Sequence, residues 1–194
     1  LNTSSAEFVI KGAANLEKFI NAGVTHIRDM ISVDYIDMQM RDLVARGLIK
    51  GPQMKVMGKV ITMTGGTSWK IAYEVDGKLA VRQATRDVLK RGADFVKIYS
   101  TGGVLDPLTS PDNTVFFADE LHAAVEVAEA AGKFVATHAH GNKGIRNALT
   151  AGIHTIEHGT FLDDWCIDTM IKQGTYLVPT LSALHHILIH GLEG

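Results

Sequence analysis

The sequence has little cysteine, almost no net charge and no long apolar run, and each absence excludes a class of protein. Cys166 is the only cysteine, so neither an intramolecular disulfide nor a zinc site of several thiolates is available. A net charge of -2 gives no reason to expect nucleic acid or an anionic membrane as a partner. No apolar stretch approaches the ~18 residues of a membrane span. The lone cysteine leaves the compartment open and favours the cytoplasm.

Length and composition predict an ordinary globular domain. A chain of 194 residues is long enough to bury a core, and a content of 46% hydrophobic and 21% charged residues is typical of folded proteins. We therefore expect one domain over residues 1–194, with no sign of disorder.

Helix-like and strand-like segments alternate along the chain, and a glycine follows each helix. Apolar residues recur at helical spacing in residues 7–21, 35–46, 79–91, 118–131, 143–151 and 163–173. Short apolar runs, typical of buried strands, fill residues 24–29, 54–61, 93–99, 134–140, 153–159 and 175–179. The helices end at Gly23, Gly47, Gly92, Gly132, Gly152 and Gly174, which suit a left-handed cap. This alternation predicts a parallel sheet with right-handed crossovers.

Two α/β architectures compete for this pattern. A doubly wound nucleotide binder should carry a glycine-rich loop after its first strand, but that strand ends here in Arg28 and Asp29. In a (β/α)8 TIM-type barrel, side chains at the carboxyl ends of the strands converge on one mouth. The residues at these ends are Arg28, Asp29, Thr64, Lys97, His138, His140, His158 and Thr180. We therefore predict a (β/α)8 TIM-type barrel that lacks its first and last strands, because six strands are too few to close it.

The strand-end side chains suggest metal chemistry. Neutral imidazole is a common zinc ligand, so His138 and His158 are candidates to hold a metal while leaving positions open. Burial lowers the pKa of a lysine, and the neutral amine of Lys97 would react with carbon dioxide to give a carbamate, an anionic oxygen ligand. Two metals bridged in this way share a hydroxide and polarise a carbonyl. This is hydrolytic machinery.

Simpler interpretations compete with this one. A single histidine at a strand end is usually a hydrogen-bonded structural residue, and a single lysine usually reaches the surface. Successive strand ends that carry Lys97, His138 and His158 favour a site over three unrelated residues. A barrel lyase that uses Lys97 as a Schiff base is weaker, because it leaves both histidines without a role. His185, His186 and His190 are interpreted as residues of a helix surface.

Five stretches together resemble the amidohydrolase superfamily. They are Ala22-Gly-Val-Thr-His-Ile-Arg-Asp29, Ile61-Thr-Met-Thr-Gly-Gly66, Gly92-Ala-Asp-Phe-Val-Lys-Ile-Tyr-Ser-Thr-Gly-Gly-Val104, Gly132-Lys-Phe-Val-Ala-Thr-His-Ala-His-Gly141 and Ala151-Gly-Ile-His-Thr-Ile-Glu-His-Gly159. The branch that they resemble is imidazolonepropionase-like and Xaa-Pro dipeptidase-like, which includes prolidase and arginine carboxypeptidase. The ordered set covers nearly the whole chain and is more specific than any one stretch.

The resemblance implies roles for four residues. Lys97 would be the carboxylated lysine that bridges two divalent metals, with zinc the first candidate. His138 would be the ligand from strand five, His158 the ligand from strand six, and His140 a contact to the substrate. The implied activity is hydrolysis of an amide bond by metal-activated water, in a dipeptide or N-acyl amino acid, by a homo-oligomer.

The chain also departs from the family pattern. No His-x-His pair precedes Glu7, no strand-eight aspartate follows, and Thr67 stands where relatives often carry histidine. We therefore expect the central part of a barrel. These departures motivate an alternative from another class, in which the chain is a catalytically inert fragment or pseudo-enzyme that serves as a binding or assembly module.

Overall fold

The computed structural model describes residues 4–106 and 108–191; residues 1–3, 107 and 192–194 of the predicted domain 1–194 lie outside the described residues. The helices are α1 (Ser5–Asn21), α2 (Ile36–Ala45), α3 (Gly77–Lys90), α4 (Ala118–Ala130), α5 (Asn142–Ala151), α6 (Asp164–Gln173) and α7 (Leu181–His190). The strands are β1 (His26–Arg28), β2 (Gln53–Lys55), β3 (Ile61–Thr62), β4 (Tyr73–Glu74), β5 (Val96–Tyr99), β6 (Val135–Ala139), β7 (Thr155–His158) and β8 (Tyr176–Val178).

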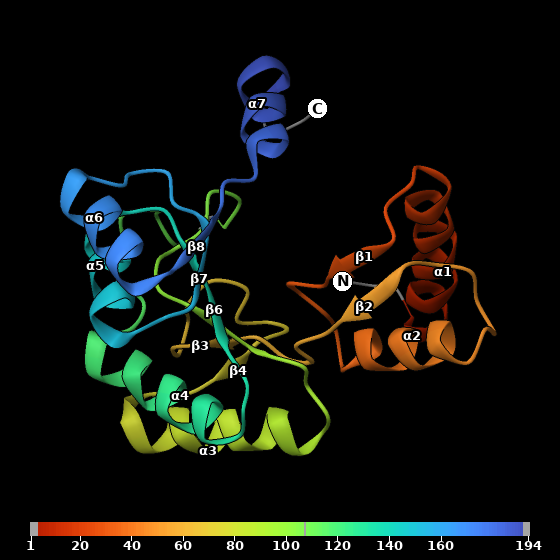
Figure 1. Ribbon diagram of the computed structural model, residues 1–194, viewed down its shortest axis with the longest axis horizontal. Helices are drawn as coiled ribbons and strands as arrows, with labels where there is room; N and C mark the ends of the chain where they lie inside the picture. Colours follow the sequence, from red (N-terminus) through yellow and green to blue (C-terminus); the bar gives the residue numbers. More distant parts are fainter. Residues whose placement is uncertain (1–3, 107, 192–194) are drawn as a thin grey trace.

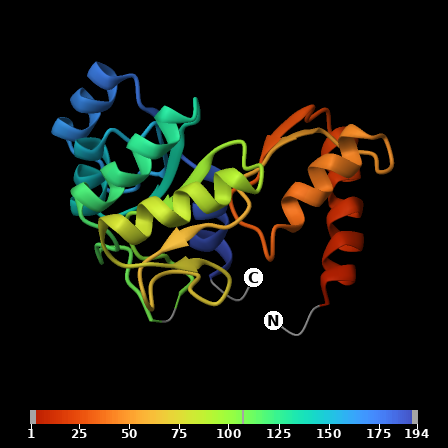
Figure 2. The same cartoon turned by 90° about the horizontal axis from the view of Figure 1, so that it is seen from below.

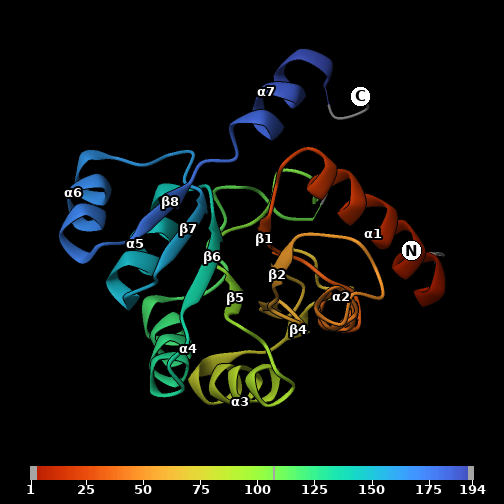
Figure 3. The same ribbon diagram turned by 45° about the vertical axis from the view of Figure 1, so that its right-hand side comes forward.

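All strand pairs in these sheets are parallel. A six-stranded sheet has the order β4-β3-β5-β6-β7-β8, and β1 pairs with β2 in a second sheet. The strands form an inner arc and the helices α2 to α6 lie around its outside (Figures 1 and 3). Seen from below, α3 and α4 run side by side under the sheet (Figure 2). The predicted α/β barrel architecture is confirmed as an open arc of parallel strands.

The core lies on both sides of the central strands. Every residue of β5 and β6 is buried, as expected for parallel strands that are covered on both faces. The largest fully buried side chains are Phe95, Phe116, Met57, Ile61, Ile98, Leu121, Ile145, Leu149, Ile153 and Ile156. Among the described residues, no helix is long and apolar enough to cross a membrane.

The six predicted helix-ending glycines are confirmed. All of them have positive φ, from +66° at Gly132 to +101° at Gly92. A side chain at these positions would be strained, which explains why glycine ends each helix before the chain turns into the next strand.

The strand predicted over residues 54–61 is wrong as a single element. β2 ends at Lys55 and β3 begins at Ile61, and the two strands pair in different sheets. Gly58 interrupts the run with φ +74°, and its N–H donates to Oδ2 of Asp37 at 2.7 Å. The apolar pattern of the sequence did not indicate this break. It did not indicate β4 either, because two residues are too few to show an alternating pattern.

Candidate metal centre

Three histidines gather at the carboxyl ends of β6 and β7. His138 lies in β6, His140 follows that strand directly, and His158 is the last residue of β7. His158 pairs in register with Ala139, so simple alternation would place it on the face opposite to His138. Its φ of +75° is unusual for a residue other than glycine and turns the ring to the side of His138.

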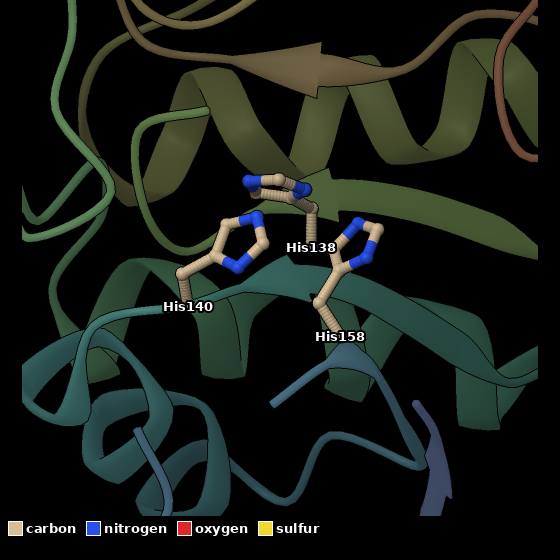
Figure 4. A group of neighbouring side chains, drawn as sticks. All are labelled: His138, His140 and His158. Carbon is tan, nitrogen blue, oxygen red and sulfur yellow. The ribbon is translucent and has the colours of Figure 1, made fainter. Parts of the chain in front are cut away.

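The three rings surround a common point. Each residue offers one nitrogen, and these nitrogens all lie within 4.8 Å of one another. The ring centroids of His138 and His158 are 4.7 Å apart, and His140 lies 4.6 Å from each of them. Figure 4 shows the rings facing one another from the ends of neighbouring strands. The structure therefore brings together three of the four predicted site residues by direct ring contact.

Hydrogen bonds to the outer nitrogens fix which nitrogen of each ring is free. Nε2 of His138 lies 3.0 Å from the carbonyl oxygen of Gly102, so Nε2 donates and Nδ1 keeps its lone pair. Nδ1 of His158 lies 2.6 Å from Oγ1 of Thr180, whose hydroxyl donates to the carbonyl of Val178. Nδ1 of His158 therefore donates as well, and Nε2 is free. Such outer contacts orient metal-binding histidines.

Burial keeps these imidazoles neutral. Desolvation lowers the pKa of His138 to about 2 and the pKa of His158 to about 4. The pKa of His140 is lowered for the same reason. Neutral imidazole is the form that binds a metal, so the cluster fits a divalent cation at neutral pH.

Lys97 lies on the neighbouring strand and is buried. It pairs in register with Ala136, two residues before His138, so both side chains are on the same face of the sheet. Desolvation lowers the pKa of Lys97 to about 7, and its charge in turn lowers the pKa of His138 and His158. A neutral amine is therefore accessible at this position near neutral pH.

A partly buried ion pair between Arg28 and Glu157 was not predicted. Glu157 shares the inner face of β7, where Oε1 accepts from Arg28 at 2.9 Å and from Oγ1 of Thr155 at 2.8 Å. The Arg28 guanidinium also stacks over the rings of Phe95 and Phe134, at 5.5 and 5.8 Å from their centroids. A charged residue inside an apolar strand was the available signal for Glu157.

Thr101 is a second residue that the sequence did not single out. Its Oγ1 donates to the carbonyl of Gly102 at 3.0 Å and accepts from the backbone N–H of His140 at 3.0 Å. The Gly102 carbonyl also accepts from Nε2 of His138. The hydroxyl of Thr101 therefore links His138 with His140. No sequence pattern marks a threonine in an irregular loop for this role.

Other predicted strand-end residues lie away from the histidines. The backbone N–H and the hydroxyl of Thr64 both donate hydrogen bonds to the carboxylate of Asp76. Asp29 lines a second cavity of about 690 Å³ with residues of α1 and α2, where desolvation raises its pKa to about 6. The expectation that functional side chains lie at the carboxyl ends of the strands therefore identified the correct edge of the sheet. It also included residues that are not part of the histidine cluster.

A cavity of about 570 Å³ opens over the three histidines. It is lined by the segment after β3, by the irregular segment after β5 and by one face of α7. The lining side chains outside the histidines include Ile31, Trp69, Lys70, Ile71, Leu105, Asp106, Leu108 and Ile187. The cavity is large enough for a small organic molecule beside the cluster.

Parallel strands covered by helices, with a histidine cluster and a cavity at their carboxyl ends, define the class of (β/α)-barrel proteins that carry their site at the barrel mouth. The chain belongs to the amidohydrolase family, whose model matches residues 4–191.

Solved structures share this fold over nearly the whole chain. A Xaa-Pro dipeptidase with bound methionine in its active site is 34% identical, with a TM-score of 0.89 over 94% of this chain and 48% of its own. A prolidase complexed with N-methylphosphonate-L-proline is 31% identical, with a TM-score of 0.91 over 98% of this chain and 50% of its own.

A curated relative is similar to part of the chain. Ochratoxinase from Aspergillus niger is 34% identical over 119 residues, which are 61% of this chain and 25% of that protein. Its crystal structure has a TM-score of 0.90 at 25% identity, over 98% of this chain and 49% of its own. The chain therefore spans about half the length of these solved relatives.

Proposed function

We propose that this chain carries the metal centre of a hydrolase that cleaves amide bonds. The observation that supports this most is the histidine cluster, in which outer hydrogen bonds leave Nδ1 of His138 and Nε2 of His158 free. Neutral rings held in this way are suited to bind a divalent metal such as zinc.

The residues that would hold the metal are Lys97, His138 and His158, with Lys97 as a carbamate and two zinc ions as the proposed metals. When bound, such metals polarise a carbonyl and lower the pKa of water. The lowered pKa of Lys97, about 7, supports the carbamate because carbon dioxide reacts with the neutral amine.

The chain's own residues do the positioning. Gly102 and Thr180 orient the two ligand rings. His140 stacks on His158 at an interplanar angle of 12°, and its Nδ1 is bonded to Thr160 at 2.7 Å. In this proposal the remaining nitrogen of His140 donates to or accepts from the substrate.

The relatives support a small substrate with an amide bond. Their names describe a Xaa-Pro dipeptidase, a prolidase and ochratoxinase. We infer a dipeptide or an N-acyl amino acid as the substrate here, cut at its C–N bond. Assembly into a homo-oligomer stays a prediction.

Hydrolysis is the direct test. The chain is incubated with Zn²⁺ and bicarbonate, and the release of amino acid from a panel of dipeptides and N-acetyl amino acids is measured. We expect turnover that is lost in His158→Asn and kept in His186→Asn, an exposed histidine of α7. Equal turnover in the two variants would contradict the proposal.

A binding or assembly module is the second candidate. Within residues 4–106 and 108–191, the cluster consists of three histidines and includes no carboxylate. A chain that binds metal and substrate without turnover in the same experiment would favour this alternative.

A further inference from the structure

Two helices of the outer layer, α3 and α4, lie side by side and are joined by ion pairs (Figure 2). Nζ of Lys78 lies 3.0 Å from Oδ2 of Asp119, and the Arg82 guanidinium pairs with the carboxylate of Glu126. Lys78 and Arg82 are four residues apart, so they share one face of α3. The first two cations of this face therefore each have an acidic partner on α4.

The same face of α3 continues with two cations that have no such partner. Arg86 and Lys90 follow Arg82 at intervals of four residues. Among the described residues, neither side chain forms an ion pair. Ala130 follows Glu126 by the same interval on α4, so an alanine stands where an acidic residue would continue the series of pairs. Positive charge is therefore uncompensated at the carboxyl ends of the two helices.

A groove of about 390 Å³ lies at this end, between α3 and α4. Two arginines, one lysine and the carboxylate of Glu126 line it, which gives the lining a formal charge of +2. The other lining side chains are apolar and include Leu89 and Val127. The groove therefore combines an excess of cations with a small apolar wall.

The guanidinium of Arg82 supplies an independent observation. Its Nη2 donates to Glu126, whereas its Nε is buried and has no hydrogen-bond partner among the described residues. A buried donor without an acceptor is unfavourable, and native structures seldom leave one without a protein, water or ion partner. Because Arg82 lines the groove, an anion bound there can supply the missing acceptor.

We propose that this groove binds a phosphate group, with Nε of Arg82 and the side chains of Arg86 and Lys90 as its donors. A phosphate monoester carries a charge of about -1.5 to -2 near pH 7, which matches the charge of the lining. Its oxygens accept from several guanidinium and ammonium donors at once. Leu89 and Val127 offer an apolar contact to the organic part of a small phosphate ester. The site lies on the outer helices and is independent of the proposed hydrolysis.

Isothermal titration calorimetry at low salt tests the inference, with inorganic phosphate, phenyl phosphate and benzoate as probes. Low salt is needed because ions screen exposed charges. We expect both phosphates to bind about tenfold more tightly than benzoate, which has one charge and two acceptor oxygens. Tighter binding of phenyl phosphate would assign the groove to a phosphate ester, and equal binding of the two phosphates would assign it to free phosphate. Benzoate that binds as tightly as the phosphates would overturn the inference.

Ala130→Glu is the sharpest variant, because it places a carboxylate beside the cations and removes none of them. We expect it to lower phosphate affinity about tenfold or more, whereas Ala130→Gln, which is similar in size but uncharged, should keep most of the affinity. Arg86→Ala should lower the affinity about tenfold, and Lys172→Ala on α6 should leave it unchanged.

Ala130 and Arg86 are exposed, so these variants should fold, which urea unfolding checks. Equal phosphate affinity in Ala130→Glu and Ala130→Gln, or no loss in Arg86→Ala, would overturn the inference.

Discussion

At the scale of single residues, the histidine centre depends on small polar groups that hold its rings. Oγ1 of Thr180 accepts a hydrogen bond from Nδ1 of His158 at 2.6 Å, and the carbonyl of Gly102 accepts one from Nε2 of His138 at 3.0 Å. Without such contacts a ring is free to rotate or to change tautomer. Ordering the ring then reduces the free energy of metal binding. The outer contacts are therefore expected to affect metal affinity as clearly as the ligands do.

Thr180→Val tests this dependence. The variant keeps the shape of the side chain but removes the acceptor for Nδ1 of His158, so we expect Zn²⁺ affinity to fall by ~10–100-fold. Isothermal titration calorimetry measures the affinity. Thr175→Val is the matched control, since Oγ1 of Thr175 bonds a backbone carbonyl at 3.2 Å but does not contact the cluster. A similar loss in both variants would contradict a specific role for Thr180.

Lys97 gives a prediction about pH. An unfolded lysine keeps its proton up to a pKa of ~10.4, whereas folded Lys97 loses it at about 7 because it is desolvated. Between these values the unfolded state binds more protons, so the free energy of unfolding rises with pH. We expect metal-free chain to gain up to ~1.4 kcal/mol per pH unit between pH 7 and 9, and Lys97→Met to lose this slope. Urea unfolding at several pH values measures it, and identical slopes would show that Lys97 is not neutral when folded.

The sequence identified the candidate residues on the strands, but not those that support them. It predicted Lys97 at a strand end, whereas Lys97 lies two residues before the end of β5. Lys97, His138 and His158 follow apolar runs, so their position was predictable. Thr101 lies in an irregular loop, and its contacts with Gly102 and His140 depend on a fold that brings the ends of β5 and β6 together. The alternation of side chains along a strand would also have placed His158 on the face opposite to His138. A sequence pattern does not show the positive φ that turns His158 back.

At the scale of secondary-structure elements, the break between β2 and β3 is the most informative feature. Gly58 has φ +74°, and a Cβ there would lie 2.5 Å from Cε of Met38 and 2.8 Å from Cδ1 of Tyr35. The position therefore requires both the backbone freedom and the small size of glycine. The break directs one apolar run into two sheets.

Gly58→Ala should destabilise the fold by ~3 kcal/mol, because it combines left-handed backbone strain with overpacking. Gly65→Ala is the matched control, since Gly65 has φ +68° with no atom within 4 Å of its Cβ position. We expect the control to cost only ~1 kcal/mol. Chemical denaturation measures both values, and equal losses would show that packing at Gly58 contributes nothing.

Helices were more predictable than strands at this scale. The six expected helices and their glycine ends are confirmed, because a long periodic face and a left-handed cap are both local properties of the sequence. β4 and the division between β2 and β3 depend on pairing with residues far along the chain. Local patterns carry no information about such pairing.

At the scale of the whole molecule, one arginine connects the two sheets through the inside of the arc. Arg28 leaves β1 and bonds Thr155 at 3.1 Å and Glu157 at 2.9 Å on β7, more than a hundred residues later in the chain. Glu157 is 5% exposed, and its carboxylate accepts hydrogen bonds from Arg28 and Thr155. The residue after Glu157 is His158, which connects the ion pair to the histidine cluster.

Arg28→Met should destabilise the chain by ~2–3 kcal/mol, since it removes the guanidinium from the buried Glu157 carboxylate and leaves the hydroxyl of Thr155 as its donor. Adding Glu157→Gln should recover a large part of that loss, because the double variant no longer contains an unpaired buried charge. Thermal or chemical unfolding of both single variants and of the double variant gives the coupling energy. Additive losses would show that the two side chains do not act as a pair.

The barrel architecture was predictable from the alternation of elements, whereas the connection between the sheets was not. Six helix–strand units favour parallel strands, and the structure contains them as an arc (Figure 3). Arg28 was expected at a strand end, but its partner Glu157 was not, because nothing in the sequence relates two residues at such a separation.

Metal content tests the central claim most directly. The purified chain is loaded with Zn²⁺ with and without bicarbonate, freed of excess metal and measured by elemental analysis beside His138→Asn and Lys97→Met. We predict retained zinc in the chain, more zinc when bicarbonate is present, loss of zinc in His138→Asn and no bicarbonate effect in Lys97→Met. No retained zinc, or the same zinc content in the chain and in His138→Asn, would contradict a metal centre at these histidines.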